Sequence, residues 1–222
     1  MKRTMFKIKA ISLSLLISLL ITTGLRAQDK SEYRQALISA LTEMGTIKNN
    51  ADNLDLANKF QRIADKETTE WIPLYYSALC TITYAFKEQD SKKVDMVLDQ
   101  AQILIDKAIK LKPTESEIWV IQGMLHQARI MVDMMTRGMS YSMKASDAFD
   151  KAESLNPENP RIYYLRAHTL LNTPPMYGGG KAAAKPMFQK ASEKFQKFSP
   201  AEPFAPNWGK NENDQLLKSC DQ

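Results

Sequence analysis

The residues of this chain best suited to chemistry are methionines gathered in one short stretch. Six of the 12 methionines in the 222-residue sequence fall there, namely Met124, Met131, Met134, Met135, Met139 and Met143. At about 3.6 residues per turn, all except Met134 share one helical face if the helix continues past Gly138, where a stop is expected. Thioethers are soft ligands that suit monovalent copper, but methionine is also an adaptable filler of cores and binding surfaces. We therefore expect packing or partner contact, with a small-ligand or Cu(I) site on a Met-rich helix 124–143 as the alternative.

Motifs typical of enzymes are absent from the sequence. It contains no His-x3-His pair, no Gly-x-Ser-x-Gly and no dinucleotide-binding fingerprint. With only two histidines in the chain, most catalytic acid–base sites would have to be built from carboxylates alone. The 25 acidic residues are scattered among lysines at helical spacing, which is typical of solvated helix faces. We therefore expect no enzymatic activity, no catalytic residues, no resident metal and no cofactor.

A glycine-rich run, Met176-Tyr177-Gly178-Gly179-Gly180-Lys181, precedes an expected helix. Backbone amides at the start of a helix can bind phosphate. A P-loop, however, needs Ser or Thr after its lysine and a preceding strand, and here Ala182 follows. A flexible connector between two helices explains the glycines as well, so the role of this loop stays open.

The excess positive charge of the chain is confined to its first 27 residues. The formal net charge is +5 with a pI near 9.0, and the bases of this segment are Lys2, Arg3, Lys7, Lys9 and Arg26. The rest of the chain carries 25 basic against 25 acidic residues, so no nucleic-acid partner is expected. A basic start, an apolar run over residues 10–21 and a small-residue exit are typical of a signal peptide. We expect cleavage near Ala27 and a periplasmic or secreted protein, with an uncleaved N-terminal segment as the alternative and the only expected membrane contact.

The two cysteines, Cys80 and Cys220, would allow one disulfide in an exported protein. Cys80 lies within the apolar run 75–86 and Cys220 lies near the end of the chain, so a bridge requires the tail to fold back onto the first half. A lone buried cysteine also behaves as a small hydrophobic residue. The sequence leaves both states open.

A repeated pattern, Ala-x3-apolar-x2-Ala-x4-Pro, runs along the chain. Clear copies start at Ala101 and Ala145, a copy without the proline starts at Ala184, and a degenerate copy starts at Ala57. Their starts are 44, 44 and 39 residues apart. Positions i, i+4 and i+7 share one helix face, where the two alanines let a neighbouring helix approach closely, and the proline ends the helix. The pattern predicts packed helix pairs, and no stretch alternates in the way a sheet requires.

An aromatic residue follows each clear proline by six positions. Trp119 follows Pro113 and Tyr163 follows Pro157, each with a small residue four positions later, and the degenerate copy places Tyr75 in the same register. With the alanine–proline pattern, this arrangement resembles the tetratricopeptide repeat over residues 70–198, although the spacing exceeds the family's period of about 34 residues. The resemblance implies an all-α, TPR-like helical-hairpin solenoid of about four helix pairs.

Three segments are expected along the chain. They are a signal peptide at 1–27, the solenoid at 28–198, opened by helices at 31–48 and 51–65, and a Pro-rich C-terminal cap segment at 199–222. Phe204 and Trp208 interleave with three prolines in the last of these. We expect this stretch to form an extended strap over the last helix pair, because the end of a solenoid must be covered.

The resemblance also implies a binding surface, because the first helix of each tetratricopeptide hairpin lines a concave groove. In this register the groove residues are Tyr76, Thr83, Glu117, Val120, Met124, Gln127, Arg161, Tyr164 and His168. The Lys and Asn residues with which the family's carboxylate clamps hold peptide ends are absent from the matching positions. We therefore expect a non-catalytic adaptor that binds a protein or peptide of the cell envelope through this groove.

Overall fold

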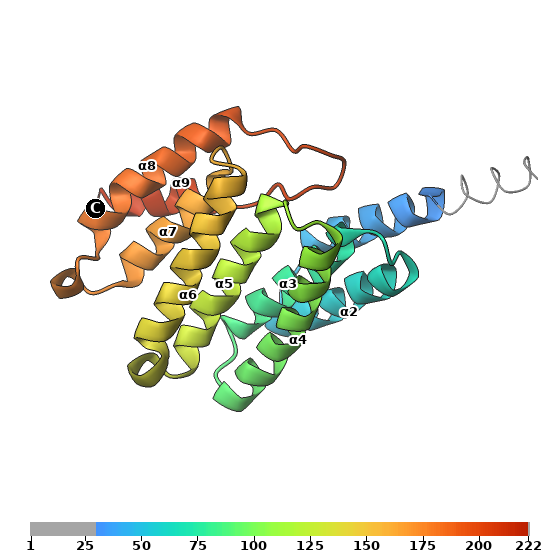
Figure 1. The fold of residues 1–222 in the computed structure, drawn as a ribbon, viewed down its shortest axis with the longest axis horizontal. Helices are drawn as coiled ribbons and strands as arrows, with labels where there is room; N and C mark the ends of the chain where they lie inside the picture. Colours follow the sequence, from blue (N-terminus) through green and yellow to red (C-terminus); the bar gives the residue numbers. More distant parts are fainter. Residues whose placement is uncertain (1–29, 222) are drawn as a thin grey trace, which may run out of the picture.

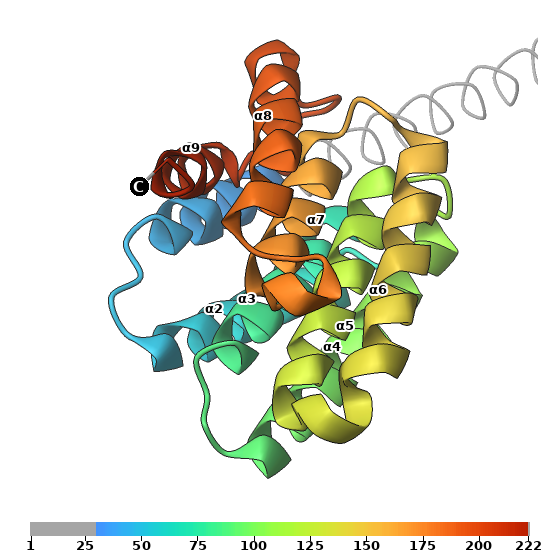
Figure 2. The same cartoon turned by 90° about the vertical axis from the view of Figure 1, so that its left-hand side faces the viewer.

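The computed structural model describes residues 30–221, which are helical over most of their length and contain no strand. A first helical stretch covers residues 30–44. It is followed by α2 (Asn50–Lys66), α3 (Trp71–Ala85), α4 (Ser91–Leu111), α5 (Ser116–Val132), α6 (Met134–Leu155), α7 (Pro160–Asn172), the short 3-10 turn η1 (Pro175–Tyr177), α8 (Lys181–Lys197) and α9 (Lys210–Ser219). Consecutive helices pack side by side as hairpins that stack along the molecule (Figures 1 and 2). The all-α prediction is confirmed.

The helix ends are where the sequence places its stop and start signals. α4 ends two residues before Pro113 and α6 ends two residues before Pro157, because proline disfavours helix in the residue before it. The side chain of Asp90 accepts hydrogen bonds from the Lys92 and Lys93 amides at the start of α4, and Asn159 does the same for Arg161 in α7. These caps satisfy amides that have no partner inside the helix.

The repeated alanine pattern forms the contacts between helices. Its alanines on α4, α6 and α8 are at most 2% exposed, and its large residues Ile105, Phe149 and Phe188 are buried with them. Gly123 of α5 lies directly against the Phe149 ring of α6, since a Cβ at this glycine would be 2.3 Å from Phe149 Cε1. Small residues therefore set the close approach of the helices, as the pattern predicts.

The expectation of one Met-rich helix over 124–143 is wrong. α5 ends at Val132 and α6 begins at Met134, because Asp133 is extended (φ −159°) and its side chain caps the Met135 and Thr136 amides. Gly138, the expected stop, lies inside α6. The methionines are thus divided between two antiparallel helices of one hairpin.

The C-terminal segment has two parts. Residues 198–209 lack a long helix and lead from α8 to α9. α9 packs on α8, and its Leu216 and Leu217, with Cys220, contact the cluster around Phe188.

The expected signal peptide at 1–27 lies outside the described residues. Within residues 30–221 no helix has the length and apolar character needed to cross a membrane.

Candidate functional site

The nine residues predicted to line the groove lie on α3, α5 and α7, on a surface we call the inner face. Four are buried, namely Tyr76, Glu117, Val120 and Arg161. The other five are half-buried, namely Thr83, Met124, Gln127, Tyr164 and His168. The structure therefore brings these residues onto neighbouring helices, but it leaves none of them fully exposed.

A buried ion pair lies at the centre of the inner face. Arg161 has no exposed surface, and its Nε donates to both carboxylate oxygens of Glu117 at 3.0 and 2.8 Å. Asn159 Nδ2 also donates to this carboxylate at 2.9 Å. Burial raises the pKa of Glu117, and the Arg161 charge opposes that rise. The pair joins α5 to α7, and with only 8% of the Glu117 side chain and none of the Arg161 side chain exposed it offers little surface to a partner.

The segment 198–209 covers this part of the inner face with backbone hydrogen bonds. Arg161 Nη1 donates to the Trp208 carbonyl at 3.1 Å, and Tyr76 OH donates to the Phe204 carbonyl at 3.2 Å. Phe204 has a φ of 67°, a conformation that costs energy in residues other than glycine and is kept only when the surroundings impose it.

Aromatic contacts add to this cover. Trp208 Nε1 donates to Tyr75 OH at 2.7 Å, and Trp71 Nε1 donates to Glu202 at 3.2 Å. The Arg161 guanidinium lies 4.4 Å from the centre of the Phe198 ring, within the range of a cation–π contact. The chain's own C-terminal segment thus occupies the centre of the surface that the sequence assigns to a partner.

The half-buried residues at the other end of the inner face also contact their own chain. Gln127 Nε2 donates to the Leu165 carbonyl at 3.0 Å and to Thr169 Oγ1 at 2.6 Å, which ties α5 to α7. Tyr164 packs against the rings of Phe188 and Trp208. These contacts explain the residue types by packing alone.

An open apolar surface lies at the end of the α5–α6 hairpin where the two helices join. We call it the methionine ledge and define it as Met131 of α5 with Met135, Met139 and Met143 of α6, whose exposed fractions are 56%, 94%, 82% and 63%. Scattered exposed apolar residues are common, but Met135, Met139 and Met143 follow one another at four-residue spacing on one face of α6, and large apolar residues grouped on one face indicate an interaction surface. The sequence points to these methionines, and only the structure shows that they lie outside the core.

The glycine-rich loop beside this region is a structural connector. The amides of Gly178, Gly179 and Gly180 donate to the carbonyls of Pro175, Pro174 and Leu170 at 2.9, 3.2 and 2.8 Å. These amides are therefore unavailable to a phosphate. The loop exposes its two large residues instead, since Met176 and Tyr177 are 80% and 73% exposed.

His126 lies on the side of α5 away from Met131, because five residues of helix turn the side chain by about 140°. Its Nδ1 is buried without a hydrogen-bond partner, and its ring packs near Tyr141. Burial lowers its pKa to about 4, helped by the Lys144 and Arg129 charges. The imidazole is therefore neutral at physiological pH.

Metal and thiol chemistry have little support in the described part of the chain. No group of three or more His, Cys, Asp and Glu residues there could hold a metal ion. Cys80 and Cys220 are both free, and burial raises the pKa of the Cys80 thiol to about 12. A thiol with that pKa is protonated and unreactive at neutral pH.

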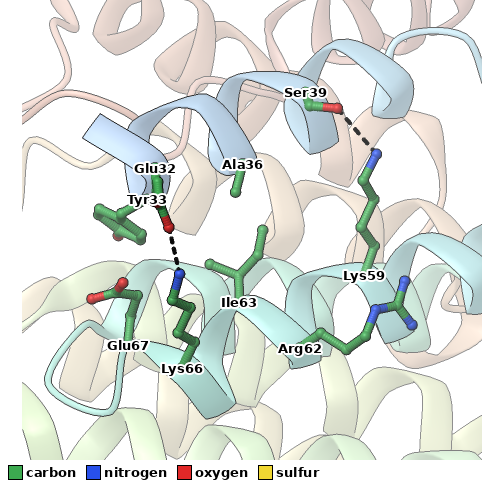
Figure 3. Close-up of a pocket in the computed structure, with 9 residues that line it drawn as sticks. All are labelled: Glu32, Tyr33, Ala36, Ser39, Lys59, Arg62, Ile63, Lys66 and Glu67. Carbon is green, nitrogen blue, oxygen red and sulfur yellow. Dashed lines mark hydrogen bonds and ion pairs between the residues drawn. The ribbon is translucent and has the colours of Figure 1, made fainter. Parts of the chain in front are cut away.

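Two small cavities lie away from both surfaces. One of about 290 Å³ lies between the first helical stretch and α2. Figure 3 shows Tyr33 and Glu67 at one end, Lys59 and Arg62 at the other, and Ile63 in the middle. The second, of about 210 Å³, lies among α2, α3 and α4. Both are below the usual range of about 300–1,000 Å³ for pockets that enclose a small molecule.

Comparison with known proteins relates the chain to a solved structure. No family model and no curated protein matches the sequence. Among solved structures, the HusA haemophore from Porphyromonas gingivalis superposes with a TM-score of 0.76 and is 31% identical in sequence. The match covers 85% of this chain and 92% of that one. At this identity and coverage, the chain belongs to the same family as the HusA haemophore.

Proposed function

We propose that this protein binds and carries a haem or a closely related porphyrin, and that it does so without catalysis. The observation that carries the proposal is the 31% identity with a haemophore over 92% of that chain. A likeness of this extent covers the helices that would form a binding surface as well as the general fold. The small-ligand alternative in the sequence is thereby favoured over the protein adaptor.

The residues of the described chain fit such a ligand better at an open surface than in a closed pocket. A porphyrin is a flat apolar ring with two carboxylate arms, and its iron accepts His, Met, Tyr or Cys as axial ligands. Both cavities are small for it. The methionine ledge offers exposed apolar and thioether groups, and Met176 and Tyr177, in the loop between α7 and α8, are exposed as well.

The groove-binding adaptor stays a prediction, together with the finer description of the fold as a TPR-like solenoid closed by a C-terminal strap. The adaptor prediction concerns the nine residues of the inner face. A peptide could reach Arg161 only after the segment 198–209 had left, because that segment now makes the contacts a peptide would make.

An exported location, periplasmic or secreted, is part of the proposal that this protein carries a porphyrin, because a carrier of an external ligand has to work outside the cytoplasm.

The proposal is tested by titrating haem into the purified protein and following the Soret absorption. We expect a saturable spectral change with a dissociation constant of about 1 μM or tighter, which corresponds to roughly −8 kcal/mol. A parallel Cu(I) titration tests the metal alternative, in which the methionines would have to supply the ligands, because no group of three or more His, Cys, Asp and Glu residues among residues 30–221 could hold a metal ion. A haem spectrum that stays unchanged at all protein concentrations would overturn the proposal, and tight Cu(I) binding would favour the metal alternative.

A further inference from the structure

We infer that the porphyrin ring lies against the methionine ledge, in a notch that α5 and α6 leave beyond the C-terminal end of α7, with its carboxylates directed toward Lys181. This inference rests on the proposed function and adds the surface at which it operates. The argument comes from the register of the three helices, the exposure of the methionines and the charge beside them.

The first wall of the notch is α5. Gln127 faces α7 and is hydrogen-bonded to Leu165 and Thr169. Met131 is one turn further along the same face of α5, level with the last turn of α7, which ends at Asn172. Met131 therefore points to the place where α7 runs out, and it is 56% exposed.

The second wall is α6. Arg166 of α7 pairs with Asp150 of α6 at 2.5 Å, which fixes the register of these antiparallel helices. Met143 lies two turns before Asp150 on the same face, level with the end of α7, and Met139 and Met135 lie beyond it. Their exposed fractions rise in that order, from 63% through 82% to 94%.

The notch exists because the helices differ in length. α6 has 22 residues and α7 has 13, so in this register α7 ends level with the middle of α6 and the first turns of α6 extend past it. In both views the α5–α6 turn extends past the end of α7 (Figures 1 and 2). An apolar stripe is thus left uncovered by the fold itself.

The shape and composition of the ledge suit a flat apolar ring. Met135 to Met143 spans eight residues, or about 12 Å at 1.5 Å per residue, which is close to the width of a porphyrin. Methionine side chains adapt to the surface they meet, and their thioethers can also ligate haem iron.

The charge beside the ledge suits the carboxylate arms. The Gly180 amide donates to the Leu170 carbonyl at 2.8 Å, which sets the start of α8 beside the end of α7. Lys181 is exposed at this helix start, and no acidic residue lies in the first turn of α8. A helix N-terminus and a lysine both favour a carboxylate, so the start of α8 offers a positive charge beside the end of α7.

The most direct test uses the methionine methyl groups as reporters. The protein is labelled with 13C-methyl methionine and titrated with zinc protoporphyrin, a diamagnetic haem analogue whose ring current shifts nearby methyl signals. We expect the largest shifts at the four ledge methionines, Met131, Met135, Met139 and Met143. No shift is expected at Met96 of α4, which is 57% exposed, as much as Met131 at 56%, but lies on another helix. Shifts concentrated elsewhere would overturn the inference.

Variants then measure the contribution of the ledge to affinity. Met139→Gln combined with Met143→Gln keeps the side-chain length and helix propensity but removes the apolar surface, so we expect haem affinity to fall about tenfold or more. Met96→Gln is the matched control and should bind as the wild type does. Lys181→Gln should weaken binding about two- to fivefold and reduce its dependence on salt.

The outcomes separate the two proposals. If the wild-type protein fails to bind haem, the proposed function is wrong. If it binds and the Met139/Met143 variant binds equally well while remaining folded, the function stands and the ledge is not its site. In that case a loss of binding in Tyr33→Phe would move the site to the cavity in Figure 3, which Tyr33 lines.

Discussion

The inner face and the methionine ledge share one apolar stripe of α5, yet their environments are opposite. Val120 is fully buried, Met124 is half-buried and Met131 is 56% exposed, although the three follow one another along the same helix face. At Val120 the stripe lies under α7 and near the segment 198–209, whereas at Met131 α7 has ended. The length of the neighbouring helix, and not the residue type, decides which part of an apolar stripe becomes core and which becomes surface.

The largest effect is expected where the inner face buries charge. Arg161→Ala leaves the Glu117 carboxylate buried without its partner, so we expect a loss of about 3–5 kcal/mol in the free energy of unfolding. Urea denaturation followed by circular dichroism measures this. Arg161→Met with Glu117→Leu removes both charges and should recover much of the loss. An Arg161→Ala variant as stable as the wild type would mean that the inner face is open to water in solution.

The second prediction concerns the contact between α5, which contributes to both surfaces, and α6, which carries most of the ledge. Gly123→Ala places a methyl group 2.3 Å from Phe149 Cε1, and such overpacking costs about 1–3 kcal/mol. Gly138→Ala is the matched control on α6, because no atom lies within 4 Å of its added Cβ. It should be neutral or stabilising by up to about 1 kcal/mol. Equal effects of the two substitutions on the melting temperature would contradict the close helix contact.

The repeat pattern in the sequence predicted the core well, because alanines at i and i+7 with a large residue between them can serve only a close helix contact. The same reasoning could not separate the inner face from the ledge. Glu117 and Arg161 are of types usually found in solvent, and their burial depends on each other and on the segment around Trp208, which lies 47 residues beyond Arg161. The break at Asp133 is not evident from the sequence either, because an aspartate inside a methionine-rich run acts as a helix cap only if the chain turns there.

A third, smaller effect is expected from His126, on the side of the hairpin away from the ledge. Its pKa is about 4 in the folded protein and about 6.5 in an unfolded chain. The unfolded state therefore binds more protons between these values, so stability falls as the pH drops from about 6.5 toward 4. The ring is only half-buried, and solvent screening limits the loss to about 1 kcal/mol.

Substitution isolates this contribution. His126→Gln should flatten the stability profile between pH 4 and 6.5 relative to the wild type, whereas His168→Gln, whose folded-state pKa is lowered less, should change it less. Unfolding midpoints measured across this range provide the comparison. A profile unchanged by His126→Gln would show that the imidazole is solvated.

The smallest effect on stability is expected at the ledge. Met135→Gln and Met139→Gln change side chains that are 94% and 82% exposed, and such substitutions usually alter the free energy of unfolding by less than about 0.5 kcal/mol. Removing apolar surface there should also raise solubility. The contrast with Arg161→Ala is the sharpest form of the comparison, because the two surfaces share α5 but only the inner face is expected to contribute to stability. If the ledge variants unfolded as readily as Arg161→Ala, the methionines would be packing residues in solution, and the notch beyond α7 would be closed by the protein itself.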